Sequence, residues 1–101
     1  MIGMIREIAL IEIDPAKAEA FEAAVAGVES AFRRGGCLEF GLHRSIENPG
    51  RYRLLVGWET VEAHTVDFRG SPEFQEWRAA AGPFFVQPPQ VEHLVQALPK
   101  A

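Results

Sequence analysis

The first apolar stretch of the chain predicts a strand that is covered on both faces. Residues 4–13 have the sequence MIREIALIEI and are followed by Asp14-Pro15. Isoleucine and leucine dominate the run, and Asp-Pro is a typical end for a strand. Side chains alternate along a strand, and both resulting faces are largely apolar: Met4, Arg6, Ile8 and Leu10 on one, and Ile5, Glu7, Ala9, Ile11 and Ile13 on the other. An apolar residue on each face indicates a neighbour on each face.

The next segment predicts one long helix over residues 16–34. Asp14 is a favoured N-cap, and Pro15 suits the first helical position because that position needs no N–H. Arg33 and Arg34 complement the helix dipole in the last turn, and Gly35-Gly36 follows as a terminator. The helix has one apolar stripe, made of Phe21, Val25, Val28 and Phe32.

Two alternating segments around a Pro-Gly turn predict a β-hairpin. Residues 37–46 and 51–59 alternate apolar and polar positions, and Pro49-Gly50 between them favours a type II turn. In the first segment we expect Leu38, Phe40, Leu42 and Ile46 on one face, and Cys37, Glu39, Gly41, His43 and Ser45 on the other. In the second we expect Tyr52, Leu54, Val56 and Trp58 on one face.

Two shorter helices and a last strand complete the pattern. Thr60 predicts the cap of a helix that begins at Val61 and ends at Gly70. Ser71-Pro72 predicts a second helix, which carries Phe74, Trp77 and Ala81 on one stripe and stops at Gly82-Pro83. The last strand is expected over residues 90–98, with Val91, His93, Val95 and Ala97 on one face.

This order is β-α-β-β-α(α)-β, which predicts an α+β fold of the ferredoxin-like type with an antiparallel sheet. Both helical segments of that fold pack on one face of the sheet, so its other face has no cover within the chain. Because the first strand is apolar on both sides, we expect a homodimer that pairs through the open sheet face.

Composition narrows the class of protein further. The 101 residues are expected to form a single domain over 1–101, with 48% hydrophobic and 24% charged residues. No apolar run is long enough for a membrane span. The net charge is −4 and Arg33-Arg34 is the one adjacent basic pair, so we expect no nucleic-acid or membrane partner. One cysteine, Cys37, and a start without a secretory pattern predict a cytoplasmic protein.

Three segments then resemble the antibiotic biosynthesis monooxygenase (ABM) family. They are LVGWETVEAH at residues 55–64, FRGSPEFQEWR at 68–78 and Val91-Glu92-His93. The resemblance implies a dimeric α+β barrel and a cofactor-independent monooxygenase, an oxidoreductase that uses O₂ on a small aromatic or quinol-like substrate. It also implies that the deprotonated substrate reduces O₂ itself, without flavin, haem or metal.

Such chemistry needs a proton acceptor, and two histidines are candidate catalytic residues. His64 falls on the predicted inward stripe of Val61, His64 and Phe68, and the usual pKa of histidine suits a base near neutral pH. The alternative for His64 is a partly buried histidine that bonds to a backbone carbonyl. His93 is the second candidate, and its alternative is a structural histidine of the sheet or the interface.

The substrate would need an apolar pocket with a few polar groups. The candidate substrate-binding residues are Trp58, Tyr52, Phe68, Arg69 and Phe84. Core packing is the alternative for the aromatic residues. Arg69 and Arg78 suit a carboxylate or phenolate, whereas ion pairs with Glu73 or Glu76 would explain them equally well.

Cofactor motifs are not among the patterns of this sequence. His43, His64 and His93 do not form an HxH, HxxH or HxxxH pair, and the lone Cys37 has no cysteine partner, so we expect no metal site. Two alternatives to a monooxygenase remain: a non-catalytic homodimer that binds a small ligand or an interaction partner, and an isomerase or decarboxylase that uses the same pocket.

Overall fold

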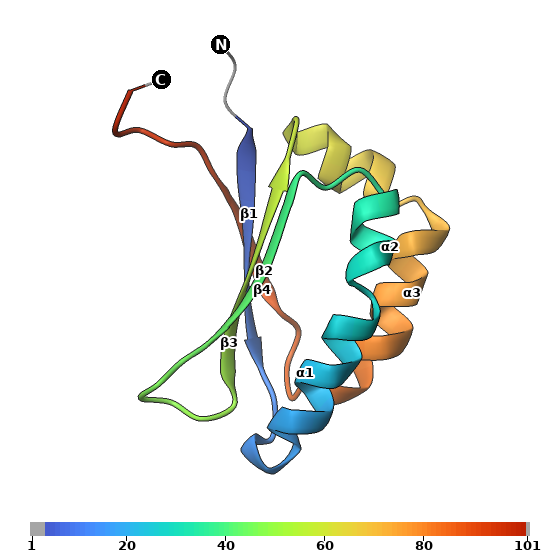
Figure 1. Ribbon diagram of the computed structural model, residues 1–101, viewed down its shortest axis with the longest axis vertical. Coiled ribbons are helices and arrows are strands. Elements are labelled where there is room, and N and C mark those ends of the chain that lie inside the picture. Colours follow the sequence, from blue (N-terminus) through green and yellow to red (C-terminus); the bar gives the residue numbers. More distant parts are fainter. Residues whose placement is uncertain (1–3, 101) are drawn as a thin grey trace.

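The computed structural model describes residues 4–100 and contains one four-stranded antiparallel sheet with strand order β2-β3-β1-β4 (Figure 1). This topology confirms the predicted α+β, ferredoxin-like arrangement. The strands are β1 (Ile5–Glu12), β2 (Glu39–Arg44), β3 (Arg51–Trp58) and β4 (Gln90–Leu94).

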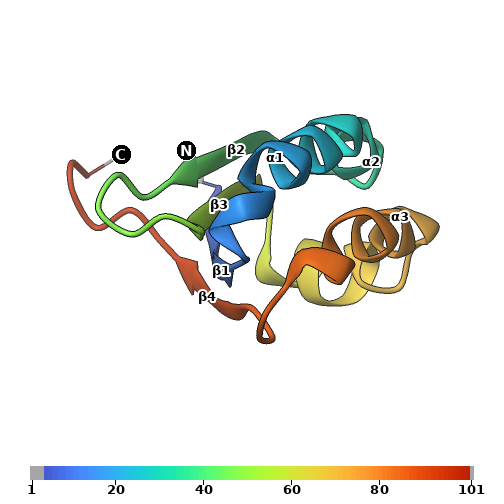
Figure 2. The same cartoon turned by 90° about the horizontal axis from the view of Figure 1, so that it is seen from below.

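The helices form a second layer on one face of this sheet, as the two views in Figures 1 and 2 show. Within residues 4–100 no helix covers the opposite face, which we call the open face. The α-helices are α1 (Ala18–Gly27), α2 (Glu29–Arg34) and α3 (Pro72–Ala81); the 3₁₀ turns are η1 (Pro15–Lys17) and η3 (Gly82–Phe84); and η2 (Ala63–Phe68) is a π-helix.

Strand β1 alternates as predicted. Glu7, Ala9 and Ile11 are buried under the helical layer, while the residues between them are only half-buried. The half-buried set, Arg6, Ile8, Leu10 and Glu12, lies on the open face. One chain therefore covers only one side of this strand.

The helix predicted over residues 16–34 is interrupted, and that prediction of one continuous helix was wrong. Val28 separates α1 from α2 with φ −115° and ψ 9°. Gly27 has the lowest helix propensity after proline, and the β-branched Val28 adds little, so this pair is a weak point. The break leaves Phe21, Val25 and Phe32 buried in the core.

The hairpin turn is confirmed. The N–H of Arg51 donates to the carbonyl of Asn48 at 3.1 Å, and Gly50 has φ +86°, as position i+2 of a type II turn requires. Strand β2 is shorter than predicted, because Leu38 and Ile46 lie outside it and are exposed. Cys37 is buried rather than on the polar face, since its N–H closes the end of α2 on the carbonyl of Phe32.

Strand β4 is also shorter than residues 90–98. Its ladder with β1 ends where Leu94 pairs with Arg6, close to the start of β1. Val95 and Leu98 beyond it are 76% and 75% exposed. Without a partner strand, residues 95–98 are not held in the sheet.

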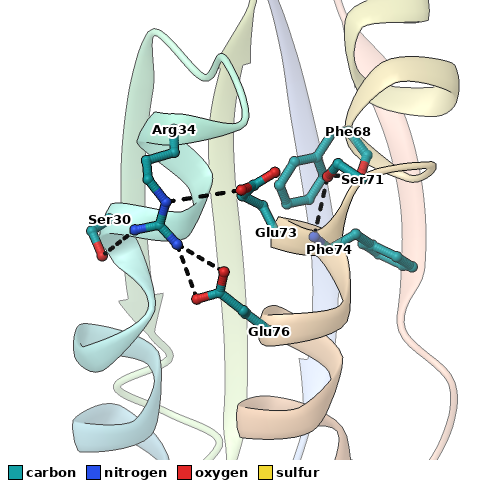
Figure 3. A network of polar contacts seen from close by, with 7 residues as sticks. All are labelled: Ser30, Arg34, Phe68, Ser71, Glu73, Phe74 and Glu76. Atoms are coloured by element: carbon teal, nitrogen blue, oxygen red, sulfur yellow. Dashed lines mark hydrogen bonds and ion pairs between the residues drawn. The ribbon is translucent and has the colours of Figure 1, made fainter.

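Helix α3 begins as predicted, with the Ser71 hydroxyl accepting the N–H of Phe74 at 3.3 Å and with Pro72 in the first turn. Its acidic residues bind α2 (Figure 3). The Arg34 guanidinium contacts both carboxylate oxygens of Glu76, at 2.8 and 3.0 Å, and lies 3.9 Å from Glu73. The ion pairs considered for Arg69 and Arg78 are therefore made by Arg34.

Aromatic side chains form the core between the two layers. The largest fully buried ones are Trp58, Tyr52, Phe21, Phe32 and Phe68. None of the helices in the described part of the chain has the length and apolarity that crossing a membrane would take.

Candidate active site

The π-helix η2 carries His64 into the core. The Thr60 hydroxyl accepts the N–H of Ala63, which starts the turn as the sequence predicts. His64 and Phe68 are buried, 3% and 1% exposed, whereas Val61 is 37% exposed. The predicted stripe of all three is thus wrong at Val61, which lies before the π-helix and outside the buried part of this segment.

A chain of three titratable side chains crosses the end of the sheet. The Nδ1 of His64 lies 2.9 Å from the Nε2 of His93, at hydrogen-bonding distance. The Nε2 of His64 lies 3.3 Å from the Oε1 of Glu7. Strands β1 and β4 pair Glu7 directly with His93, so the sheet register places both of these side chains beside His64.

Trp58, on the neighbouring strand β3, orients Glu7 and His64. Its indole Nε1–H donates to the Oε1 of Glu7 at 3.0 Å. Its ring stacks on the imidazole of His64, with centroids 5.3 Å apart and an interplanar angle of 15°. Trp58 therefore holds both Glu7 and His64 in place.

Burial shifts the pKa values of Glu7 and His64. Burial raises the pKa of Glu7, and the bond from Trp58 and the charge of Arg69 only partly oppose it. Burial also lowers the pKa of His64 to about 4, aided by the nearby charges of Arg69 and His93. His64 is therefore neutral at pH 7 and has one donor and one acceptor nitrogen.

Glu7 is the residue that the sequence analysis missed as a functional group. A signal was present, because Glu7 falls on the helix-facing side of an otherwise apolar strand, between Ile5 and Ala9. A carboxylate at a core position is costly unless it has a partner or a role. The histidine partner was not visible, since His64 is far away in the sequence.

A pocket of about 720 Å³ opens beside Glu7 and His64. This volume is typical of a site for a small molecule. Apolar side chains from β1, β3, α3, η3 and β4 supply most of the wall, and it is lined by Ala9, Ile11, Leu54, Phe74, Trp77, Pro83, Phe85, Pro88, Pro89 and Val91. Arg69 and Arg78 also line it.

Glu7 lines this pocket, and its second oxygen has no hydrogen-bond partner in the described chain. Within residues 4–100, Oε2 of Glu7 makes no hydrogen bond, and no fully buried side-chain nitrogen or oxygen there lacks a partner. Oε2 is therefore open to a molecule in the pocket that Glu7 lines. A ligand hydroxyl at that position would meet a buried carboxylate.

The candidate site residues fall into three groups. His64 and Arg69 line the pocket, and His93 contacts His64 from behind. Trp58 and Phe68 are fully buried behind this wall, where they pack against each other.

The other two lie elsewhere. Tyr52 donates its hydroxyl to Glu22 at 2.6 Å, and burial together with Glu22 raises the pKa of Tyr52 to about 12. Phe84 packs on Phe21, and the neighbouring Phe85 lines the pocket instead. Residues 4–100 also contain no group of three or more His, Cys, Asp or Glu side chains placed to hold a metal ion.

Comparison with known proteins identifies the family. The sequence profile described as "antibiotic biosynthesis monooxygenase" matches residues 4–80. The chain belongs to the antibiotic biosynthesis monooxygenase family. Among curated proteins it is similar to the uncharacterized protein YczJ of Bacillus subtilis (strain 168), with 40% identity over 89% of this chain and 96% of that protein.

Solved structures of the ABM family agree with this assignment. A candidate antibiotic biosynthesis monooxygenase from Bordetella bronchiseptica is 52% identical, has a TM-score of 0.92, and aligns over 96% of this chain and all of its own. A second, from Caulobacter crescentus CB15, is 31% identical with a TM-score of 0.78, over 91% of this chain and 88% of its own. The family profile covers Glu7, Trp58 and His64, whereas His93 and the wall formed by residues 82–91 lie beyond it.

Proposed function

We propose that this ABM-family protein is a cofactor-independent monooxygenase that oxidises a small aromatic, quinol-like substrate with O₂. The observation that supports this best is a buried carboxylate of raised pKa, Glu7, which faces an apolar pocket of about 720 Å³. Oxygenation without a cofactor requires a deprotonated substrate in a water-poor pocket, and this arrangement suits both needs.

Glu7 is the proton acceptor of the proposed reaction. Both ring nitrogens of His64 already face neighbours, His93 and Glu7, so the imidazole has no lone pair free for a ligand. Oε2 of Glu7 has no hydrogen-bond partner among the described residues, and Glu7 lines the pocket. A raised pKa also makes this carboxylate a stronger base toward a phenolic proton than an ordinary surface glutamate would be.

His64 and His93 carry the proton away from the pocket. A neutral imidazole donates at one nitrogen and accepts at the other, so it passes a proton along without a net charge change. His93 is half-buried on β4 and is the last of the three side chains in the proposed proton path. His64 and His93 therefore enter the proposal as relay and positioning residues.

The oxygen step balances without a further reductant. Loss of the hydroxyl proton to Glu7 gives a phenolate that transfers one electron to O₂, and the two radicals combine into a peroxide at a ring carbon that bears a hydrogen. The peroxide takes up a proton and loses water, so a ring C–H, the conjugated C–OH and O₂ become two C=O groups and H₂O. One oxygen atom enters the product, and the substrate supplies every electron.

Oxygen consumption tests this function. Purified protein, dialysed against a chelator, is mixed with a panel of anthrones and dihydroxynaphthalenes in an oxygen electrode. We expect enzyme-dependent uptake of one O₂ per quinone formed, at a rate that chelation leaves unchanged. If the panel binds but no oxygen is consumed, the protein is a small-ligand-binding protein; isomerised or decarboxylated product without oxygen uptake would assign it to that other enzyme class.

We also propose that two copies pair through the open face of the sheet, into a dimeric α+β barrel. Ile8, Leu10, Leu55 and Leu94 place apolar side chains on that face, and the ion pairs Arg6–Glu39 and Arg51–Glu12 flank them. Arg53 and Glu92 lie beside Leu10 and Ile8 in the same register, so the face mixes apolar and charged side chains, as protein interfaces commonly do. The single cysteine, Cys37, is a buried free thiol, and this supports a location in the reducing cytoplasm.

A further inference from the structure

We propose that the substrate carries a carboxylate, which Arg69 and Arg78 bind at the mouth of the pocket while its hydroxyl group meets Glu7. This inference rests on the proposed function only where it places the substrate hydroxyl at Glu7. Binding of the carboxylate needs no catalysis and is tested separately.

The two arginines are available for an anion. Both line the pocket and are exposed. Within the described residues neither has a carboxylate within 4.0 Å, and nor does Arg53 on the open face, whereas the remaining arginines are paired: Arg6 with Glu39, Arg33 with Glu29, Arg34 with Glu73 and Glu76, Arg44 with Glu22, and Arg51 with Glu12.

The acidic residues of α3 are already engaged on its other side. Figure 3 shows Glu73 and Glu76 turned toward Arg34 of α2, which bridges the two helices. They are therefore occupied by a structural contact. Neither glutamate is therefore available to pair with Arg78 on the same helix or with Arg69 before it.

Local contacts hold the Arg78 guanidinium and the Arg69 backbone at the pocket. Arg78 lies over the ring of Phe74, 6.0 Å from its centroid, and Phe74 is itself part of the wall. The backbone N–H of Arg69 donates to the carbonyl of His64 at 3.1 Å, which fixes the start of that side chain. Guanidinium groups match the planar fork of a carboxylate better than an ammonium does.

The charge of the pocket differs from that of the whole protein. The chain has a net charge of −4, yet the charged residues that line the pocket are two arginines and one carboxylate. The positive charge of Arg69 also acts on the two buried groups. It opposes the rise in the pKa of Glu7 and adds to the fall in the pKa of His64. A cationic mouth on an acidic protein favours an anionic ligand.

The position of these charges sets the orientation of the ligand. Glu7 lies on β1 beside His64, Arg69 follows η2, and Arg78 lies on α3, and the rest of the pocket lining is mostly apolar. A hydroxylated aromatic acid satisfies both ends, because its ring fills the apolar middle. The opposite orientation would place the carboxylate against Glu7, which like-charge repulsion disfavours.

A matched pair of probes tests the carboxylate site. 6-Hydroxy-2-naphthoate and 2-naphthol differ by the carboxylate, which lies at the opposite end of the ring system from the hydroxyl, and their binding is followed by calorimetry without any turnover. We expect the naphthoate to bind about tenfold more tightly or better, since charge-assisted hydrogen bonds outweigh neutral ones. Arg69→Gln and Arg78→Gln should each weaken naphthoate binding by about three- to tenfold and leave naphthol binding unchanged.

Two further variants complete the design. Arg33→Gln removes a positive charge on α2 outside the pocket and should leave both affinities unchanged. Arg78→Lys keeps the charge but loses the fork, so it should recover part of the affinity lost in Arg78→Gln. Equal affinity for the two probes, or the same loss in Arg33→Gln as in Arg78→Gln, would overturn the proposal.

The outcomes separate this proposal from the proposed function. Naphthoate selectivity that depends on both arginines, together with no oxygen uptake by any quinol, would support the carboxylate site and refute the monooxygenase. Rapid oxidation of neutral quinols, with no preference for acids in binding, would support the monooxygenase and refute the carboxylate site.

Discussion

Glu7 combines a cost in stability with a chemical role. Taking a carboxylate out of water favours its neutral form, and the bond from Trp58 compensates only partly. Such perturbed groups are concentrated at functional sites, and Glu7 lies at one end of a pocket. The same burial that raises its pKa should therefore lower the stability of the protein.

The Glu7→Gln variant tests both effects. It keeps the shape and an oxygen that accepts from Trp58, but it removes the base. We expect kcat for quinol oxidation to fall by about 10²–10⁴-fold, the usual contribution of a general base, while naphthol affinity stays nearly constant. Turnover within about threefold of the wild type would remove Glu7 from the proton path.

The stability difference between that variant and the wild type should depend on pH in a defined direction. Because the folded pKa of Glu7 is raised above 4.5, the folded state retains a proton that the unfolded state releases, and stability falls as pH rises through that window. We expect Glu7→Gln to melt at a higher temperature than the wild type at pH 8, with a smaller difference at pH 5. Glu59→Gln, an exposed neighbour of Trp58, serves as the control and should show no such trend.

At the scale of elements, the hairpin turn also determines where the first strand ends. The carbonyl of Gly50 accepts the N–H of Ile13 at 2.8 Å, so the β2–β3 turn is bonded to the segment that leaves β1. A β-carbon at Gly50 would collide with the carbonyl oxygen of Ile13. Gly50 thus meets two requirements, a positive φ and a close approach of two backbones.

Gly50→Ala should therefore be unusually costly. The left-handed conformation alone costs a non-glycine residue about 1–2 kcal/mol, and the collision adds to that, so we expect a loss of about 2–4 kcal/mol in the free energy of unfolding. Gly36→Ala is a matched control, because Gly36 has φ +103° and open space around it. Urea denaturation should show the larger loss at Gly50; equal losses would mean that the backbone approach is unimportant.

At the scale of the whole molecule, the open face carries apolar side chains that the helical layer leaves uncovered. Leu55 lies opposite Ile8 across β1 and β3, both half-buried, with no helix above them in the described chain. If this face pairs with a second copy, a charge at its centre would be desolvated without a partner. That is a large penalty for association.

Leu55→Lys should therefore convert the dimer into a monomer. We expect light scattering at micromolar concentration to give twice the chain mass of 11.2 kDa for the wild type, and about the chain mass for the variant. Val66→Lys, on the helical side and 62% exposed, should remain dimeric. A monomeric wild type would refute pairing through the open face.

Local sequence signals determined most of the elements. Alternation and turn chemistry predicted β1, the hairpin and its type II turn, because these depend on neighbouring residues and on backbone sterics. The Asp14 and Ser71 caps were predicted for the same reason. Element ends were less predictable: β4 stops at Leu94 because its partner ladder ends there, and that depends on β1.

The tertiary structure alone decided the site. His64 is identifiable from its helical stripe, but its contacts Glu7 and His93 come from strands at opposite ends of the sequence, and only the β1–β4 register places them together. Tyr52 and Trp58 share one strand face, yet Trp58 bonds to Glu7 while Tyr52 bonds to Glu22, because they lie at opposite ends of β3. Burial and charge, which set the pKa values of Glu7 and His64, depend on what surrounds a residue in space, and a pattern along the chain does not contain that information.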